Sequence, residues 1–288
     1  LLGMICGNGE IKRGAIETTI SIEIPHKKLA TENNNDVRIY VRASITDIRT
    51  VLEPLIGTGL NFTQQDNYSI ISFTKRNDEY MMREILRYTG NAVSHENIRI
   101  DEEIFAFTRD EKISFLQGFA DVTGYIRRSN YFFKTYMHRV YLEVPHNWHL
   151  VSDVCQLLKD VNIPVQAIDW AHPNMRDGNL VKYNEGKPDF WKKEHQIKIW
   201  ANEFLPIGFA VLHKREALTQ FAIELVDGIK SEGKNPENVT HKFYWEGKGK
   251  NKVKPHHPSE NDAFIPSEIR GRHYDSWKQI AKDLGYEE

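Results

Sequence analysis

Two nine-residue stretches of the chain carry, near their ends, oxygen-bearing side chains that could hold a metal ion. Residues 1–9 read LLGMICGNG and residues 116–124 read LQGFADVTG. Carboxylate and amide oxygens suit a hard cation such as Mg²⁺, and an uncharged amide holds the ion far less tightly than a carboxylate does. Our candidate metal ligands are therefore Asn8, Glu10 and Asp121.

The pattern of these stretches predicts how such side chains would be positioned. Each is a short apolar run with glycine in the third place, Gly3 or Gly118, and another glycine in the ninth. A glycine lets a second backbone come close because it has no Cβ, and the last glycine suits the left-handed position just past a helix C-terminus. Because strand-like residues follow both stretches, we expect two helices packed face to face, each leading into a sheet.

This doubled motif resembles that of the LAGLIDADG family of homing endonucleases. In that family the two motif helices form the central interface, and acidic residues at their ends meet at the scissile phosphates. The family's metal-binding acid stands in the eighth place of the motif, where this chain departs from the pattern with Asn8 and Thr123. The resemblance spans roughly residues 1–228 and implies Mg²⁺ or Mn²⁺ as the cofactor.

The resemblance also implies which side chains take part in catalysis. In the family a basic residue near the end of the fourth strand lies beside the cleavage site, where a cation can stabilise charge developing on the phosphate. The implied catalytic positions are Asn8, Asp121, Thr123, Lys75 and Lys198. Structural interpretations stay open: Glu10 as an exposed strand acid, Asp121 as a helix-end residue bonded to backbone, and both lysines as solvated strand ends.

Hydrophobic periodicity predicts the elements that follow the first motif. Alternation of apolar and polar residues predicts strands, and spacing of three to four predicts helices. The predicted strands are residues 14–24, 36–43, 59–64 and 68–75, and the predicted helices are residues 44–57 and 78–88. The resulting order is helix, two strands, helix, two strands, helix, which is the αββαββα unit of the family.

The second half of the sequence repeats this order. HRVYLEV, residues 138–144, aligns with VRIYVRA, residues 37–43, and this alignment pairs Arg139 with Arg38. An internal repeat is the most informative architectural signal that a sequence offers. The predicted fold is α+β, with two pseudo-symmetric αββαββα repeats, saddle-like antiparallel sheets, a central helix pair and a C-terminal extension. The predicted domains are residues 1–100, 101–228 and 229–288.

Basic side chains gather on the predicted strands, although the formal net charge is only −2. Alternation would turn Arg, Lys and Tyr outward, where a β-ribbon can enter the major groove and reach bases and phosphates. A merely solvated face would show the same alternation. The candidate DNA-binding residues are Lys12, Arg13, Arg38, Arg42, Arg127, Arg128, Lys134 and Arg139. The extension from residue 229 is rich in Lys, Gly and Pro, which suggests a basic arm with a short helix near Trp277.

Composition excludes several other classes of protein. Two cysteines, Cys6 and Cys155, are too few for a disulfide framework or a four-cysteine zinc site, and they suggest reduced thiols and a cytoplasmic location. No apolar run approaches the ~20 residues of a membrane span, so no membrane partner is expected. Two repeats in one chain favour a monomer with internal pseudo-twofold symmetry.

The sequence thus supports two functions. The first is site-specific recognition of double-stranded DNA with metal-dependent phosphodiester cleavage, by a homing- or restriction-type endonuclease or by an inactivated form in which Asn8 replaces an Asp. The alternative is a DNA- or RNA-binding maturase or regulator, descended from the same family, that does not cut.

Overall fold

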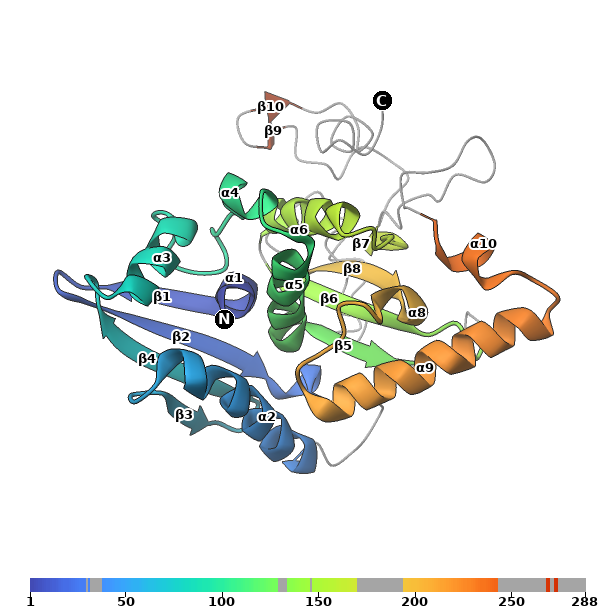
Figure 1. Cartoon of the computed structure of the whole chain (residues 1–288), viewed down its shortest axis with the longest axis horizontal. Coiled ribbons are helices and arrows are strands. Elements are labelled where there is room, and N and C mark those ends of the chain that lie inside the picture. The colour runs from blue at the N-terminus through green and yellow to red at the C-terminus, as the bar shows by residue number, and fades with distance from the viewer. Residues whose placement is uncertain are drawn as a thin grey trace.

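The structure is a computed structural model that describes residues 1–29, 31, 38–128, 134–145, 147–169 and 194–242, together with the short strands β9 (Glu268–Ile269) and β10 (Arg272–His273). Two four-stranded antiparallel sheets lie on either side of a central helix pair (Figure 1). None of the helices in this described part is both long enough and apolar enough to span a membrane.

The first half builds the sheet of order β1-β2-β4-β3. Its elements are α1 (Leu2–Asn8), β1 (Gly9–Arg13), β2 (Glu17–Pro25), η1 (His26–Lys28), α2 (Arg38–Ile56), β3 (Asn61–Gln64), β4 (Tyr68–Arg76) and α3 (Tyr80–Thr89). Apolar side chains alternate along β2 and β4, so that one face of this sheet packs on the helices and the other faces outward.

The second half builds the sheet of order β5-β6-β8-β7, which repeats the topology of the first. Its elements are α4 (Glu102–Phe105), α5 (Arg109–Thr123), β5 (Gly124–Arg127), β6 (Arg139–Pro145), α6 (Trp148–Asp160), β7 (Ala167–Asp169), β8 (Glu194–Trp200), α8 (Ala201–Phe204), α9 (Leu212–Ser231) and α10 (Pro236–Thr240). The predicted α+β class with two similar antiparallel sheets is confirmed. The predicted helix near Trp277 lies outside the described residues.

The two motif helices, α1 and α5, pack directly on each other at the centre, as predicted. A Cβ added at Gly3 would stand 1.9 Å from the carbonyl oxygen of Phe115, and one at Gly7 would stand 2.8 Å from side-chain atoms of Val122 and Thr123. Only glycine allows these distances, because every other residue would push the helices apart. The small residues of the motif therefore set the spacing between the two halves.

The glycines in the ninth place, Gly9 and Gly124, do not adopt the left-handed conformation predicted for them. Both are extended, with φ near −99° and −96°, because β1 and β5 begin at these residues. Glycine is still required there: a Cβ would lie 2.5 Å from the carbonyl oxygen of Ile5 and 2.6 Å from that of Ala120. The helix turns into the strand too sharply for any side chain.

The prediction of a strand at residues 36–43 is wrong, because the described part of this segment is the first turn of α2. Burial at Val41, Ser44, Ile48 and Leu52 follows helical spacing, and the hydroxyl of Ser44 donates to Tyr40 O within the helix. Alternation of apolar and polar residues over so short a segment fits a strand and a helix equally well. The second strand of the first sheet is β2 instead.

Strand pairing gives a different internal alignment from the predicted one. Gly9 pairs with Ile22 in β1–β2, and Gly124 pairs with Leu142 in β5–β6. Ile22 is therefore equivalent to Leu142, and the repeat is ISIEIPH (residues 20–26) against VYLEVPH (residues 140–146). Arg38 and Arg139, which the sequence analysis paired, belong to a helix and a strand and are not equivalent.

Candidate DNA interface and central cleft

A cleft of about 970 Å³ lies where the C-terminal ends of α1 and α5 meet the two sheets. Asn8 and Thr123, the eighth residues of the two motifs, both line it. Its ionisable side chains include Glu10, Glu23, Asp66, Glu96, Glu143 and Glu194, against only Lys27 and Lys28 among lysines. A cleft with such an excess of carboxylates attracts cations.

Glu23 and Glu143 are the functional candidates that the sequence analysis missed. They are equivalent in the two halves, since each follows the residue paired with the ninth-place glycine, and both line the cleft. The signal was present in the sequence as Ile-Glu-Ile-Pro-His and Leu-Glu-Val-Pro-His. This similarity is hidden when residues 138–144 are aligned with residues 37–43, as the sequence analysis aligns them.

The Glu23 carboxylate is exposed in the cleft beside a second carboxylate. Glu10 pairs across the strands with Ser21, which places its side chain diagonally from Glu23 on the same face. Partial burial, and then the negative charge of Glu10, raises the pKa of Glu23 above its usual range. The backbone of Glu23 is fixed because its carbonyl accepts a 2.7 Å hydrogen bond from Asn8 Nδ2. Two neighbouring carboxylates therefore stand at the end of α1.

Glu143 faces the same cleft but is neutralised by the chain itself. Its Oε2 forms an ion pair with Lys28 Nζ, and its Oε1 accepts a 2.7 Å hydrogen bond from Gln196 Nε2. Lys28 also lies 3.4 Å from Glu194 Oε1 and 5.2 Å from the centre of the Tyr125 ring. Burial lowers the pKa of Lys28 to about 7, because a desolvated ammonium is disfavoured, and the charge of Glu194 opposes this change.

Asp121, predicted as a metal ligand and catalytic acid, points away from the cleft. Its side chain is fully buried and accepts hydrogen bonds from the backbone N–H groups of Ala210 and Val211, just before α9. Burial raises its pKa to about 6, while Lys214 and these hydrogen bonds act in the opposite direction. Lys214 in turn donates to Gly124 O at 2.7 Å. Asp121 thus anchors α5 to α9, which corresponds to the structural interpretation.

Thr123 and Asn8, the eighth residues of the two motifs, differ in how well they could bind a divalent cation. The Thr123 hydroxyl donates to Phe119 O at 2.8 Å within its own helix. Asn8 donates its amide N–H to Glu23 O, which leaves its amide oxygen available as a metal ligand in the cleft that Glu10 and Glu23 also line. The carboxylate oxygens of Glu10 and Glu23, together with the neutral amide oxygen of Asn8, therefore suit Mg²⁺ or Mn²⁺ in the first half. Among the described residues no three His, Cys, Asp or Glu side chains stand close enough together to hold a metal by themselves.

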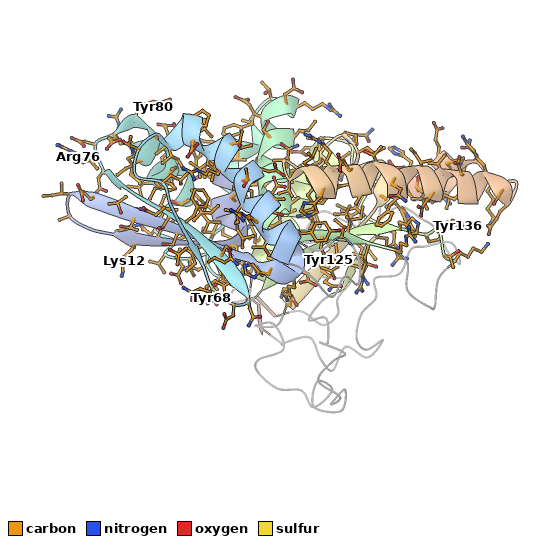
Figure 2. All side chains as sticks on the ribbon, turned by 90° about the horizontal axis from the view of Figure 1, so that it is seen from below. Lys12, Tyr68, Arg76, Tyr80, Tyr125 and Tyr136 are labelled. Atoms are coloured by element: carbon orange, nitrogen blue, oxygen red, sulfur yellow. The ribbon has the colours of Figure 1, made fainter. Side chains whose placement is uncertain are left out.

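Lys75 and Lys198, predicted as equivalent, occupy different places. Lys75 pairs with Thr18, whose buried side chain faces the helices. Lys75 also lies five residues along β4 from Ile70, which is the strand partner of Glu23. Five residues correspond to roughly 17 Å, and Figure 2 shows the adjacent Arg76 at the outer end of the first sheet. Lys198 pairs with Tyr141, so its first-half equivalent is Ser72.

The outer face of the first sheet is open and rich in hydrogen-bonding side chains. The strand registers place Lys12, Thr19, Ser21, Asn61, Thr63, Tyr68, Ser72 and Thr74 on it, all of them exposed or half-buried. Lys12 and Tyr68 lie on the side of the strands away from the helices in Figure 2. Of the predicted DNA-binding residues in this half, Lys12 alone has its side chain on this face. Arg13 donates instead to Gly90 O, Arg42 is exposed on α2, and the side chain of Arg38 is outside the described residues.

The outer face of the second sheet is a closed layer of cations and aromatic rings. Tyr125 stacks on Tyr141 at 5.1 Å, and the Arg127 guanidinium lies over both rings. Arg139 lies 4.5 Å from the centre of the Trp200 ring and is only 3% exposed. These cation–π contacts use the groups that could otherwise reach DNA. Arg127 keeps an exposed side chain.

Two further predicted DNA contacts are turned toward α9. Arg128 lies 3.5 Å from a carboxylate oxygen of Glu224, and Lys134 forms an ion pair with Glu232. Glu224 belongs to α9 and Glu232 is the residue that caps its C-terminal end, and α9 packs against β5 of the second sheet. Arg128 and Lys134 therefore connect the sheet to its own helix, which is a structural role.

Neither a scan against protein-family models nor a search of curated proteins finds a match. The chain is similar to the crystal structure of I-DmoI in complex with DNA and Ca, at 13% identity and TM-score 0.38 over 70% of this chain and 82% of that chain. A second structure, I-DmoI with DNA and Mn, gives 15% identity and TM-score 0.37 over 74% and 92%. The I-SmaMI LAGLIDADG homing endonuclease bound to cleaved DNA gives 11% and 0.37 over 80% and 89%. Sequence identities and TM-scores this low carry no argument about activity, which has to be inferred from this chain's own residues.

Proposed function

We propose that this chain binds double-stranded DNA along the outer face of its first sheet and cleaves a phosphodiester bond at the central cleft. The observation that carries the proposal is the pair of equivalent glutamates, Glu23 and Glu143, in one cleft at the ends of the two central helices. The two halves already provide both members of the pair, so we propose a monomer that acts as two repeats, residues 1–100 and 101–228.

DNA contact is supported by the chemistry of the open face. Its hydroxyl, amide and ammonium groups can donate to and accept from base edges, and a curved antiparallel sheet fits the major groove. The Thr19 and Thr74 hydroxyls lie 2.8 Å apart, so each orients the other toward a partner above the sheet. Lys12, at the edge of this face, adds a contact to phosphate.

Cleavage would use the first-half carboxylates. Glu10 and Glu23, with the amide oxygen of Asn8, would hold Mg²⁺ or Mn²⁺, which lowers the pKa of a bound water and neutralises charge on the phosphate. The chain's own part is to orient these oxygens: the Asn8 hydrogen bond fixes the Glu23 backbone, and β1–β2 pairing fixes Glu10. Hydrolysis would then add hydroxyl to phosphorus and a proton to the departing deoxyribose oxygen.

The experiment is a binding and cleavage assay on a library of random-sequence duplexes, with Mg²⁺, with Mn²⁺ and with EDTA. We expect salt-dependent binding in all three conditions, and cleavage only with a metal. Glu23→Gln should keep binding and lose cleavage, whereas Glu17→Gln removes the same charge from the same strand, outside the cleft, and should keep metal-dependent cleavage. Cleavage by Glu23→Gln at the normal rate would contradict the assignment.

A second function, nucleic-acid binding without cleavage, is favoured by one observation. The eighth motif positions carry Asn8 and Thr123, neither of which brings a charge to the cleft. Asn8→Asp would restore a third carboxylate beside Glu10 and Glu23. A wild-type chain that binds DNA but cuts only after this substitution would decide for the binding protein.

A further inference from the structure

We infer that Lys28 takes the place of a divalent cation in the second half of the cleft, so that the chain cuts only one of the two DNA strands. This inference rests on the cleavage activity proposed above. It starts from the two glutamates, which are equivalent by strand register but differ in what surrounds them.

In the second half both acidic side chains next to the cleft are held by lysine. Lys28 Nζ is ion-paired with Glu143 and lies 3.4 Å from Glu194, and Lys27 Nζ lies 3.6 Å and 3.4 Å from the same two residues. The side chain of Lys28 is only 4% exposed, and Gln196 occupies the other oxygen of Glu143. A metal ion at Glu143 would have to displace a buried ammonium group.

In the first half no lysine plays this part. The cleft neighbour of Glu23 is another carboxylate, Glu10, and among the described residues the Glu23 carboxylate takes part in no ion pair and no side-chain hydrogen bond. Its backbone carbonyl alone is bonded, by Asn8. The first-half acids are thus free for a cation, and the second-half acids are not.

Part of the difference is that Tyr125 stands in the second half where Glu10 stands in the first. The rest originates in two residues of the repeat. Residues 24–28 read IPHKK and the equivalent residues 144–148 read VPHNW, so Lys27 and Lys28 correspond to Asn147 and Trp148. Lys28 reaches from the first half across to β6 and β8 of the second. Asn147, in the second half, instead donates to the backbone carbonyls of His95 and Ile98. Lys27 and Lys28 therefore occur in the first repeat and are replaced in the second.

One cation gives one cut because of symmetry. The strands of a duplex are related by twofold axes perpendicular to the helix, and a pseudo-twofold protein centred on such an axis presents one half to each strand. A chain with a single metal-holding half would therefore hydrolyse one strand, adding hydroxyl to phosphorus and a proton to the leaving deoxyribose oxygen. On the other strand the Lys28 cluster would leave the bond intact.

The first test counts cations rather than products. Mn²⁺ added to the full chain, followed by electron paramagnetic resonance, should show one bound ion per chain. Glu23→Gln should weaken that binding at least tenfold, and Glu17→Gln, the exposed acid on the same strand, should leave it unchanged. Lys28→Met should raise the count to two. Two ions in the unaltered chain would overturn the inference, as would a count that Glu23→Gln does not change.

The second test reads the products on a supercoiled plasmid library. The unaltered chain should convert plasmid to the open circle, with linear product below about a tenth of it, and Lys28→Met should increase the linear fraction. Lys230→Met, which removes an exposed lysine of α9 away from the cleft and the outer face, should not. If Lys28→Met fails to fold, shown by loss of its thermal transition, the product ratio of the unaltered chain decides alone. Linear product as the main early species overturns the inference. Absence of DNA binding would refute the proposed function itself, whereas binding with equal cutting of both strands refutes only the single-strand inference.

Discussion

The two halves of this chain share a topology but differ on the surface that the topology exposes. The outer face of the first sheet is open, with Thr, Ser and Asn side chains around Lys12. That of the second is closed by stacked tyrosines and by Arg139 lying on Trp200. The cleft between them shows the same contrast, since within the described part of the chain the Glu23 carboxylate has no ion-pair partner, whereas Glu143 is paired with Lys28. Duplication preserved the strand order, while single side chains separated the functions.

Asp121 and Lys214 hold α5 against α9 in the second half of the chain. Loss of this contact should have the largest effect on stability. Lys214→Met removes the nearby positive charge that stabilises the buried Asp121 carboxylate and the donor to the carbonyls of Ala120, Asp121 and Gly124. Leaving a buried charge uncompensated costs about 3–5 kcal/mol. Chemical denaturation should show this loss. Lys230→Met, on the exposed part of the same helix, is the matched control and should change stability by less than about 0.5 kcal/mol.

The third-place glycines of the two motifs allow a direct comparison of the halves. Gly3→Ala puts a Cβ 1.9 Å from Phe115 O and should destabilise the chain by about 3 kcal/mol. Gly118→Ala meets nothing closer than 3.5 Å, and the better helix propensity of Ala should make it neutral or stabilising by up to about 1 kcal/mol. Thermal unfolding of both variants measures the difference. Equal effects would mean that the helices are not spaced as described.

The contrast between the outer faces predicts different consequences for two basic residues. Lys12→Ala should weaken DNA binding about fivefold and reduce the slope of log K against log salt by about 0.9, the loss of one phosphate contact. Arg139→Ala should instead lower the free energy of unfolding, because Arg139 is buried against Trp200. Fluorescence anisotropy across a salt series, with denaturation of each variant, separates the two. A reversed pattern would show that the second face is the one that binds DNA.

The smallest expected effect concerns the two carboxylates of the first half. Glu10→Gln removes one of the two causes that raise the pKa of Glu23, so this pKa should fall, while burial keeps it above the usual range. A raised folded-state pKa means that the folded protein binds the proton more tightly, so stability decreases as pH rises through that range. Glu23→Gln should therefore stabilise the chain slightly at pH 7. Carbon-13 NMR of the glutamates follows the titration, and Glu17→Gln serves as the control.

Much of the fold was predictable because it follows from local patterns. The motif glycines gave the central helix pair, and alternating residues gave β4 and β6 close to their observed bounds. The error at residues 36–43 has a local cause too: Val37, Ile39 and Val41 alternate over a window too short to exclude a helix. That error then misaligned the repeat and concealed the equivalence of Glu23 and Glu143.

The sequence by itself determined that two similar halves meet through glycine-bearing helices, because close approach of two backbones allows no other residue. Only the tertiary structure decided which acids serve the cleft. Asp121 is in the motif, yet amides 89 and 90 positions later in the chain turn its carboxylate away. Lys28 neutralises Glu143 from 115 residues away, an ion pair that no local pattern encodes. Side-chain charge is written in the sequence, but the pairing of charges depends on which segments the fold brings together.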